Sequence, residues 1–274
     1  MKPYYFYLPP WSNVSGGGTA IHRLAHEISV LGFPVYVNTK VQNPDWSRIP
    51  FADSCAGDSV AVYPEQVGGN PLGGSKVVRY VMHIPGYFGG PPLSSYLSTD
   101  ILFVYSEFWN KEVGLNLPAE RILEIPTLLN INMFVDKKFP RSDYLVYRGK
   151  CRNPELKETE NIPKLSGNFL GDSGQRLLAD KLNRCSRLYS YDIMTVLIEI
   201  ARLCGCPVTI IKDSERKTHP RFAYAAPDYG IIFMNYEQET KQLPLDSEIV
   251  RAEYSNKEQT MREQIKNFIG ITQQ

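Results

Sequence analysis

Two kinds of segment alternate along the first half of the chain. Some are short apolar runs of strand length, and others have apolar residues spaced so that they share one face of a helix. Between the first two runs, apolar residues recur at positions 21, 24, 25, 28 and 31, and Gly32 follows as a C-cap. Ser106 is placed to cap a second helix over residues 107–113. The predicted strands cover residues 4–8, 33–37, 59–64, 76–82, 101–105 and 121–125. Strands separated by helices or long loops predict a mainly parallel sheet.

The same pattern starts again after a polar stretch at residues 136–141. Residues 224–233 indicate either a loop that contacts a nucleobase or sugar, or only a link to the tail. The polar, amphipathic tail over residues 247–271 predicts one or two helices. The other predicted elements of this half are strands over 144–147, 185–189 and 207–211, and helices over 177–183 and 192–203. We therefore expect an α/β protein with two Rossmann-like domains, residues 1–137 and 138–274.

Composition narrows the classes of function. The 274 residues include 30 Lys and Arg against 29 Asp and Glu, which argues against a general nucleic-acid binder. The five cysteines show no C-x-x-C spacing, so we expect free thiols in a reducing cytosol. No apolar run approaches the roughly 18 residues of a membrane-spanning helix, and the N-terminus lacks a signal-peptide core. These features predict a cytoplasmic protein and leave peripheral membrane or protein-complex contact open.

Two glycine-bearing or basic segments are candidates for phosphate binding. Gly16, Gly17 and Gly18 lie at a strand-to-helix turn, where backbone N–H groups can approach an anion; a ligand-free loop is the alternative. The loop is not the strict G-x-G-x-x-G fingerprint, and no acidic residue follows the second strand, so NAD is disfavoured. Arg148 and Lys150 follow a predicted strand and indicate either a phosphate contact or a solvated surface.

Three further positions carry candidate chemistry. His83 follows a strand and precedes a Gly/Pro-rich loop, so it is either a ligand contact or a structural residue. Asp192 is expected to cap a helix whose N-terminus lies at the carboxyl edge of the sheet, where open α/β folds bind ligands. His22 and His26 lie four apart on one helix, but no third ligand is evident, so no metal site is expected.

The segment over residues 191–208, YDIMTVLIEIARLCGCPV, resembles the C-terminal motif of GT-B glycosyltransferases, especially the retaining family 4 type. That motif has two Glu residues followed by Ala-x-x-x-Gly-x-Pro-Val. Residues 100–134 resemble the end of that family's first domain. His83, the glycine loop and residues 147–150 occur in the family's order. The resemblance is spread over about two thirds of the chain in short pieces.

The resemblance implies transfer of a sugar from a nucleotide diphosphate to a saccharide or lipid-linked acceptor, with the donor held between a first, acceptor-side domain and a second, nucleotide-sugar-binding domain. His83 and Asp192 are then the expected catalytic residues, and neither a metal nor a cofactor is expected. The expected donor and phosphate contacts are Gly16, Gly17, Gly18, Arg148, Lys150, Tyr191, Thr195 and Glu199. The implied setting is bacterial surface-polysaccharide, lipopolysaccharide or O-antigen biosynthesis.

The chain departs from the family's motif at two positions. Asp192 stands where the family has its first Glu, and Ile200 stands where a second Glu binds the ribose hydroxyls. Glu199 is adjacent to Ile200, but one step along a helix turns a side chain by about 100°. Two alternatives follow: a transferase that uses a CMP-activated acidic sugar, or a non-catalytic accessory subunit that binds a carbohydrate or nucleotide.

Overall fold

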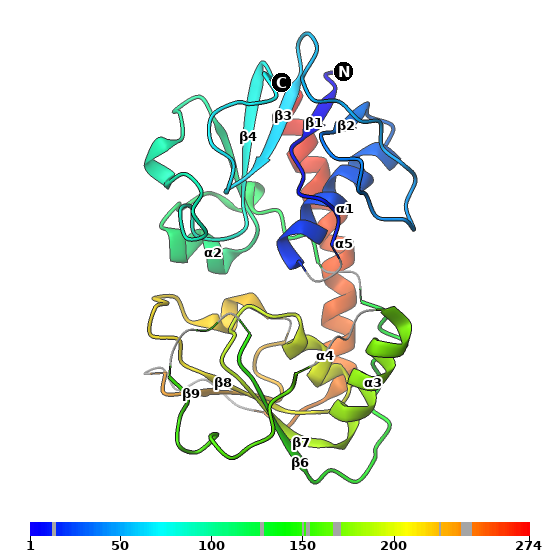
Figure 1. The fold of residues 1–274 in the computed structure, drawn as a ribbon, viewed down its shortest axis with the longest axis vertical. Coiled ribbons are helices and arrows are strands. Elements are labelled where there is room, and N and C mark those ends of the chain that lie inside the picture. Colours follow the sequence, from blue (N-terminus) through cyan, green and yellow to red (C-terminus); the bar gives the residue numbers. More distant parts are fainter. Residues whose placement is uncertain are drawn as a thin grey trace. The chain divides into compact units, whose positions relative to one another are not determined.

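The computed structural model describes residues 1–12, 15–126, 129–149, 151, 154–166, 171–224, 226–236 and 243–274. The chain forms two compact units (Figure 1). Unit 1 comprises Met1–Thr127 and Lys257–Gln274, and unit 2 comprises Leu128–Asn256. The last helix, Ser247–Thr272, begins in unit 2 and ends in unit 1. The domain boundary expected after residue 137 stays a prediction.

Unit 1 is built on a five-stranded parallel sheet of order β2-β1-β3-β4-β5. The order reverses between β1 and β3, which creates a topological switch point at the carboxyl edge of the sheet. The strands are β1 (Tyr4–Phe6), β2 (Val35–Val37), β3 (Val60–Pro64), β4 (Lys76–Val81) and β5 (Ile101–Val104). All five lie within predicted runs, and their nearly continuous burial is typical of parallel strands.

Helices cover one face of this sheet and loops cover the other. The helical face packs against α1 (Gly16–Val30) and the last turns of α5 (Ser247–Thr272), whose Phe268 contacts Tyr4 and Phe103. On the opposite face, loop residues such as Leu72 pack on the strands in place of a helix. The shorter helices of the unit are α2 (Glu107–Val113), η1 (Leu93–Ser95) and η2 (Ala119–Arg121).

Unit 2 contains a four-stranded parallel sheet of order β6-β7-β8-β9. Its strands are β6 (Asp143–Tyr147), β7 (Cys185–Ser190), β8 (Val208–Ile211) and β9 (Ile231–Met234). Its helices are α3 (Gly171–Arg184), α4 (Leu197–Leu203) and η3 (Pro220–Ala223). The chain is therefore a mixed α/β protein with two parallel sheets, consistent with two Rossmann-like domains.

Three expected elements differ from the structure. α4 begins at Leu197 rather than at residue 192, so Asp192 is not its N-cap. Residues 121–125 form only an isolated bridge, Val104 to Ile122, instead of a strand. Ile231–Met234 forms the fourth strand of unit 2 and overlaps the end of the stretch, residues 224–233, that was expected to be a ligand loop or a link. The expected helix Glu107–Val113 and its Ser106 cap are confirmed.

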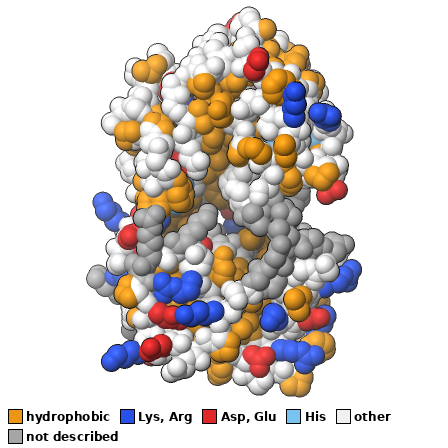
Figure 2. Space-filling view, viewed as in Figure 1, with side chains coloured by type: hydrophobic (Ala, Val, Ile, Leu, Met, Phe, Trp, Pro, Cys, Tyr) orange, Lys and Arg blue, Asp and Glu red, His pale blue; other side chains and the backbone are white. Residues whose placement is uncertain are grey.

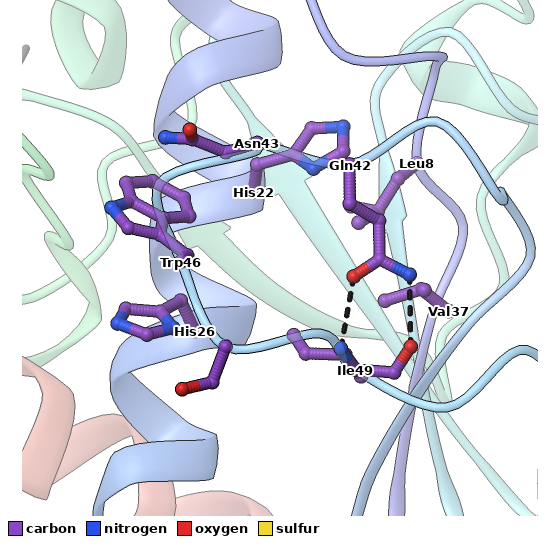
Figure 3. A pocket seen from close by; sticks show the side chains of 9 residues that line it. Leu8, His22, His26, Val37, Gln42, Asn43, Trp46 and Ile49 are labelled. Carbon is purple, nitrogen blue, oxygen red and sulfur yellow. Dashed lines mark hydrogen bonds between the residues drawn. The ribbon is translucent and has the colours of Figure 1, made fainter.

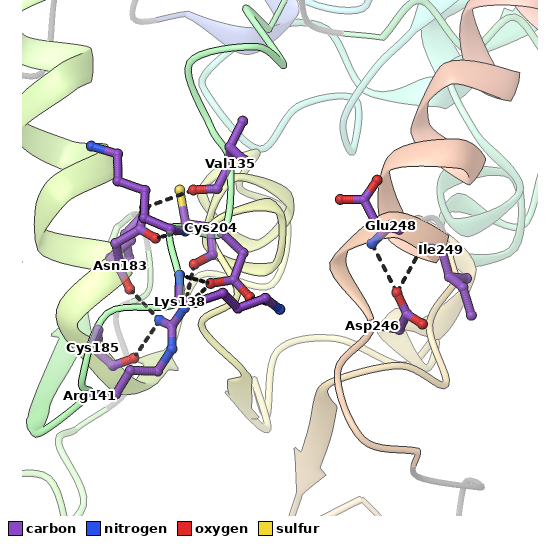
Figure 4. Close-up of polar contacts among 12 residues, drawn as sticks. Val135, Lys138, Arg141, Asn183, Cys185, Cys204, Asp246, Glu248 and Ile249 are labelled. Atoms are coloured by element: carbon purple, nitrogen blue, oxygen red, sulfur yellow. Dashed lines mark hydrogen bonds and ion pairs between the residues drawn. The ribbon is translucent and has the colours of Figure 1, made fainter.

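Gly205, from the Gly-x-Pro-Val sequence, has a structural role in unit 2. It has a positive φ of 74°, and an added Cβ would lie 2.5 Å from Nη2 of Arg141. Arg141 donates hydrogen bonds to the carbonyl oxygens of Leu182, Cys185 and Cys204 at 3.0, 3.2 and 2.8 Å (Figure 4). The glycine thus leaves room for the segment that leads into β6.

Charged and apolar side chains both occur on the visible surface of the two units. On the face drawn in Figure 2, apolar side chains occur on both units, and more of the visible Lys and Arg side chains lie on unit 2. No helix among the described residues combines the length and apolar character needed to cross a bilayer.

Candidate functional site

The carboxyl ends of β6 and β7 bring two of the sequence-predicted segments into contact. The parallel register pairs Tyr147 with Ser190, so the residues that follow each strand emerge side by side. Gly149 has a φ of 52°, and an added Cβ would lie 2.3 Å from Oδ2 of Asp192. Residues 148–149 and 191–192, more than forty positions apart, therefore form one cluster at the carboxyl edge of the sheet, the edge at which open α/β sheets generally bind ligands.

Arg148 lies against a buried aromatic ring in this cluster. Its guanidinium carbon is 4.5 Å from the ring centroid of Tyr191, a cation–π contact. The Tyr191 hydroxyl accepts a hydrogen bond from the amide of Leu156 at 2.8 Å and shares one with the Thr159 hydroxyl at 2.6 Å. Because Tyr191 is 1% exposed and its hydroxyl is engaged, it serves as a fixed platform for Arg148.

Asp192 and Thr195 shape the turn between β7 and α4. Asp192 Oδ1 accepts a hydrogen bond from the amide of Met194 at 3.0 Å, and Thr195 Oγ1 accepts one from Leu197 at 3.3 Å. Burial raises the pKa of Tyr147, and the Asp192 charge adds to this, while a hydrogen bond with Thr195 opposes it. Tyr147 therefore stays a neutral hydroxyl at physiological pH, next to an ionisable carboxyl.

Glu199, another expected donor contact, lies in a buried ion pair. Its carboxylate pairs with the guanidinium of Arg202, whose side chain is fully buried. Arg202 also donates to the carbonyl oxygens of Ala226 and Tyr229 at 2.9 and 3.2 Å. This network supports the loop before β9 and accounts for a buried carboxylate at this position without a ligand. The neighbouring Ile200 is buried as well. Lys150, another expected phosphate contact, lies outside the described residues.

The glycine loop of unit 1 begins α1 at the carboxyl end of β1. Ser15 caps the helix, and its hydroxyl accepts a hydrogen bond from Gly18 N at 3.1 Å. An added Cβ on Gly18 would lie 2.9 Å from that hydroxyl oxygen, whereas Gly16 has open space. Gly17 borders Met82, since an added Cβ would lie 3.8 Å from its sulfur. The loop and the residue before His83 therefore meet beside the switch point.

His83 is packed by aromatic rings that the sequence interpretation did not anticipate. Its ring centroid lies 4.8 Å from Tyr87, 4.7 Å from Phe88 and 4.6 Å from Trp109. Glu65, directly after β3 and 3% exposed, accepts a hydrogen bond from the amide of Met82 at 3.1 Å. Glu65 could not be singled out from the sequence, because one Glu after an apolar strand matches no motif. The fold nevertheless places its carboxylate at the carboxyl edge of the unit 1 sheet.

A separate pocket lies between α1 and the segment that follows β2 (Figure 3). Its lining includes His22 and His26, both projecting from α1. His22 Nε2 lies 2.8 Å from the carbonyl oxygen of Pro9, and burial lowers the pKa of His22 although this hydrogen bond opposes the shift. Among the described residues, no group of three His, Cys, Asp or Glu side chains is arranged to hold a metal ion.

Comparison with protein-family models gives no match, and comparison with curated proteins gives none either. A solved structure of an uncharacterised protein from Klebsiella pneumoniae resembles the chain with a TM-score of 0.39 and 12% sequence identity. The similarity covers 78% of this chain and 84% of that one. Likeness at this level supports no statement about function.

Proposed function

We propose that the protein is a glycosyltransferase of the GT-B type, which transfers a sugar from a nucleotide-sugar donor to a saccharide or lipid-linked acceptor. The observation that carries the proposal is the cluster at the ends of β6 and β7, where Arg148 lies on the Tyr191 ring and Gly149 contacts Asp192. A cation, a carboxylate and exposed backbone at the carboxyl edge of a parallel sheet suit a phosphorylated polyol.

In the proposed reaction, the bond between the donor's anomeric carbon and the diphosphate oxygen breaks. The acceptor oxygen bonds to that carbon, the acceptor proton is released, and the diphosphate leaves with its bonding electron pair. Arg148 stabilises the negative charge that develops on the diphosphate, because its guanidinium is held against the Tyr191 ring before the donor arrives. Asp192 accepts hydrogen bonds from sugar hydroxyls, and retention of the anomeric configuration follows from the family resemblance alone.

In unit 1, the proposed contributions are the glycine loop and His83. The N-terminus of α1 is the positive end of the helix dipole, which favours an anion, and its first turn carries no acidic side chain. His83 is held by three aromatic neighbours at a strand end, which suits a residue that orients a sugar. The GT-B arrangement, in which both domains contribute to one donor site, stays a prediction, as does a cytoplasmic location in surface-polysaccharide synthesis.

Turnover tests the proposal. Purified protein is incubated with UDP-, GDP-, ADP-, TDP- and CMP-activated sugars and a panel of saccharide acceptors, and release of the free nucleotide is measured. We expect turnover with at least one donor, reduced about 10²–10³-fold by Arg148→Ala and also reduced by His83→Ala. Arg184→Ala is the matched control, because this exposed arginine of unit 2 stacks on Phe139 outside the cluster.

The outcomes separate the proposal from its alternatives. Activity with CMP-activated acidic sugars alone would favour the acidic-sugar transferase. Nucleotide binding without turnover for any donor would favour the accessory, non-catalytic subunit. Full activity in both Arg148→Ala and His83→Ala would refute the assigned site.

A further inference from the structure

The turn between β7 and α4 is held by buried hydroxyl groups. Because α4 begins only at Leu197, the carbonyl oxygens of the turn need partners other than helical amides. Two side chains supply them at consecutive positions. Ser190 Oγ donates to the carbonyl oxygen of Asp192 at 2.8 Å, and the Tyr224 hydroxyl donates to that of the buried Ile193. The backbone that carries the Asp192 side chain is therefore held by two hydrogen bonds.

Tyr224 is itself held in place on the other side of this contact. It directly follows η3 and is buried. Two residues later, the carbonyl oxygen of Ala226 accepts a hydrogen bond at 2.9 Å from Arg202, which pairs with Glu199. Ala226 has a φ of 41°, a left-handed conformation that a residue with a Cβ adopts only where its surroundings impose it. The buried ion pair therefore anchors the segment that carries Tyr224.

The Tyr224 hydroxyl keeps its proton throughout the physiological pH range. Burial raises the pKa of Tyr224 well above its ordinary value, and the charges of Asp192 and Glu199 add to this shift, while the Arg202 charge opposes it. The phenol therefore stays a hydrogen-bond donor to the carbonyl oxygen of Ile193. A donor that does not titrate suits a residue that holds a backbone in one place.

The turn also fixes a tight contact within the cluster at the ends of β6 and β7. Asp192 Oδ1 accepts from the amide of Met194 at 3.0 Å, so the carboxylate is oriented by the turn that carries it. A Cβ on Gly149 would lie 2.4 Å from Cβ of Asp192, so little room separates the two segments. A displacement of only about 1 Å at a substrate-contacting group can cost about 10²-fold in rate.

We propose that Tyr224 and Ser190 are positioning residues for the candidate site, whose hydroxyls hold two consecutive carbonyl oxygens and thereby fix the Asp192 carboxylate beside Gly149. The consequence for the donor rests on the proposed glycosyltransferase function, in which Asp192 accepts hydrogen bonds from the sugar. The effect on the turn does not depend on that function.

Amide hydrogen exchange tests the effect on the turn. Tyr224→Phe removes the hydroxyl and keeps the ring that fills the buried space. The readout is the exchange rate of the Met194 amide, measured by NMR on the full-length protein, because this amide is bonded to Asp192 Oδ1. We expect its exchange to become about tenfold faster, the factor that corresponds to one buried hydrogen bond.

Two further variants sharpen this measurement. Ser190→Ala removes the other hydroxyl bond to the turn and should also speed exchange of the Met194 amide, which covers the case that Tyr224→Phe does not fold. Tyr80→Phe is the matched control, because it removes a buried hydroxyl bonded to a carbonyl oxygen, that of Leu123 at 2.5 Å, in unit 1. Exchange of the Met194 amide should not change in this control.

Steady-state kinetics tests the consequence for the donor. In Tyr224→Phe we expect the KM for the nucleotide sugar to rise about five- to tenfold. The Kd for the corresponding nucleoside diphosphate should stay within about twofold, because this ligand lacks the sugar and depends on Arg148. A variant that is merely less stable would not separate the two ligands in this way.

Two results would overturn the proposal. The first is an exchange rate of the Met194 amide that is unchanged in both Tyr224→Phe and Ser190→Ala, or that rises equally in Tyr80→Phe. The second is faster exchange with an unchanged KM for the nucleotide sugar. Failure of the proposed function would look different: the wild type would turn over no nucleotide sugar, and the exchange rates would still decide whether the two hydroxyls hold the turn.

Discussion

Gly149 and Asp192 lie in contact across the ends of β6 and β7, so close that a Cβ on the glycine would lie 2.3 Å from the Asp192 carboxylate. The contact joins two segments that the sequence predicts independently: the basic stretch after β6 and the acidic residue after β7. The absence of a side chain at Gly149 is therefore what lets the cation and the carboxylate share one edge.

Gly149→Ala is expected to destabilise unit 2 by about 2–4 kcal/mol. The positive φ of 52° costs about 1–2 kcal/mol for an L-residue, and the overlap with Asp192 adds about 1–2 kcal/mol. Urea unfolding followed by circular dichroism measures the change. Gly114→Ala is the control, because Gly114 has a φ of 72° with open space around it and should show only the backbone cost. Equal losses in the two variants would contradict the contact.

Glu199→Ala is expected to destabilise the protein by about 3–5 kcal/mol, because it leaves the fully buried Arg202 without its carboxylate partner. Chemical denaturation gives the free energy of unfolding. Glu248→Ala is the matched control: its carboxylate lies 3.8 Å from Arg251 but is 77% exposed, so a change within about 0.5 kcal/mol is expected. A stable Glu199→Ala protein that no longer responds to nucleotides would instead support ribose binding by Glu199.

The pH dependence of stability should include a contribution from His22. Burial lowers the pKa of His22, so between this pKa and the unfolded value of about 6.5 the unfolded chain binds a proton that the folded chain does not. The contribution of His22 to the free energy of unfolding is therefore fully present above about pH 6.5, and it is lost as the pH falls below that value. The difference between the urea midpoints measured at about pH 7.5 and about pH 5.5 should be smaller in His22→Gln than in the wild type.

His219 acts in the same direction, because burial and the Arg221 charge lower its pKa. The double variant His22→Gln/His219→Gln should therefore have a flatter pH profile than either single variant. A profile unchanged from that of the wild type in both His22→Gln and the double variant would contradict the buried, neutral state of His22.

The sequence allowed the parallel strands and most helices to be predicted, because their burial follows the apolar pattern directly. It did not locate the start of α4, since Asp192 and Thr195 bond to the nearby amides of Met194 and Leu197 and so favour a turn over the first helical residues. Nor did it identify β9, because Ile231–Met234 is too short for periodicity to separate a strand from a buried loop.

Long-range side-chain bonds account for the other differences. Residues 121–125 form a short, mainly apolar run of strand length, but the carbonyl oxygen of Leu123 accepts from the Tyr80 hydroxyl and the Glu124 amide donates to Gln264. These bonds replace part of the strand pairing, and no local pattern shows them. The same limit applies to the candidate site. Arg148, Asp192 and His83 are candidates because they follow predicted strands, and their roles stay predictions, whereas the pairing of Glu199 with Arg202 depends on the tertiary fold and could not be predicted.

Binding of a nucleoside diphosphate at the β6–β7 edge can be measured directly as a change in thermal stability in the presence of UDP, GDP, ADP, TDP and CMP. A ligand that binds only the folded protein must raise its melting temperature. We predict that at least one nucleoside diphosphate raises it in the wild type and in Arg184→Ala, and that the shift is lost in Arg148→Ala. No shift with any nucleotide, or an equal shift in Arg148→Ala, would show that this edge is not the nucleotide site.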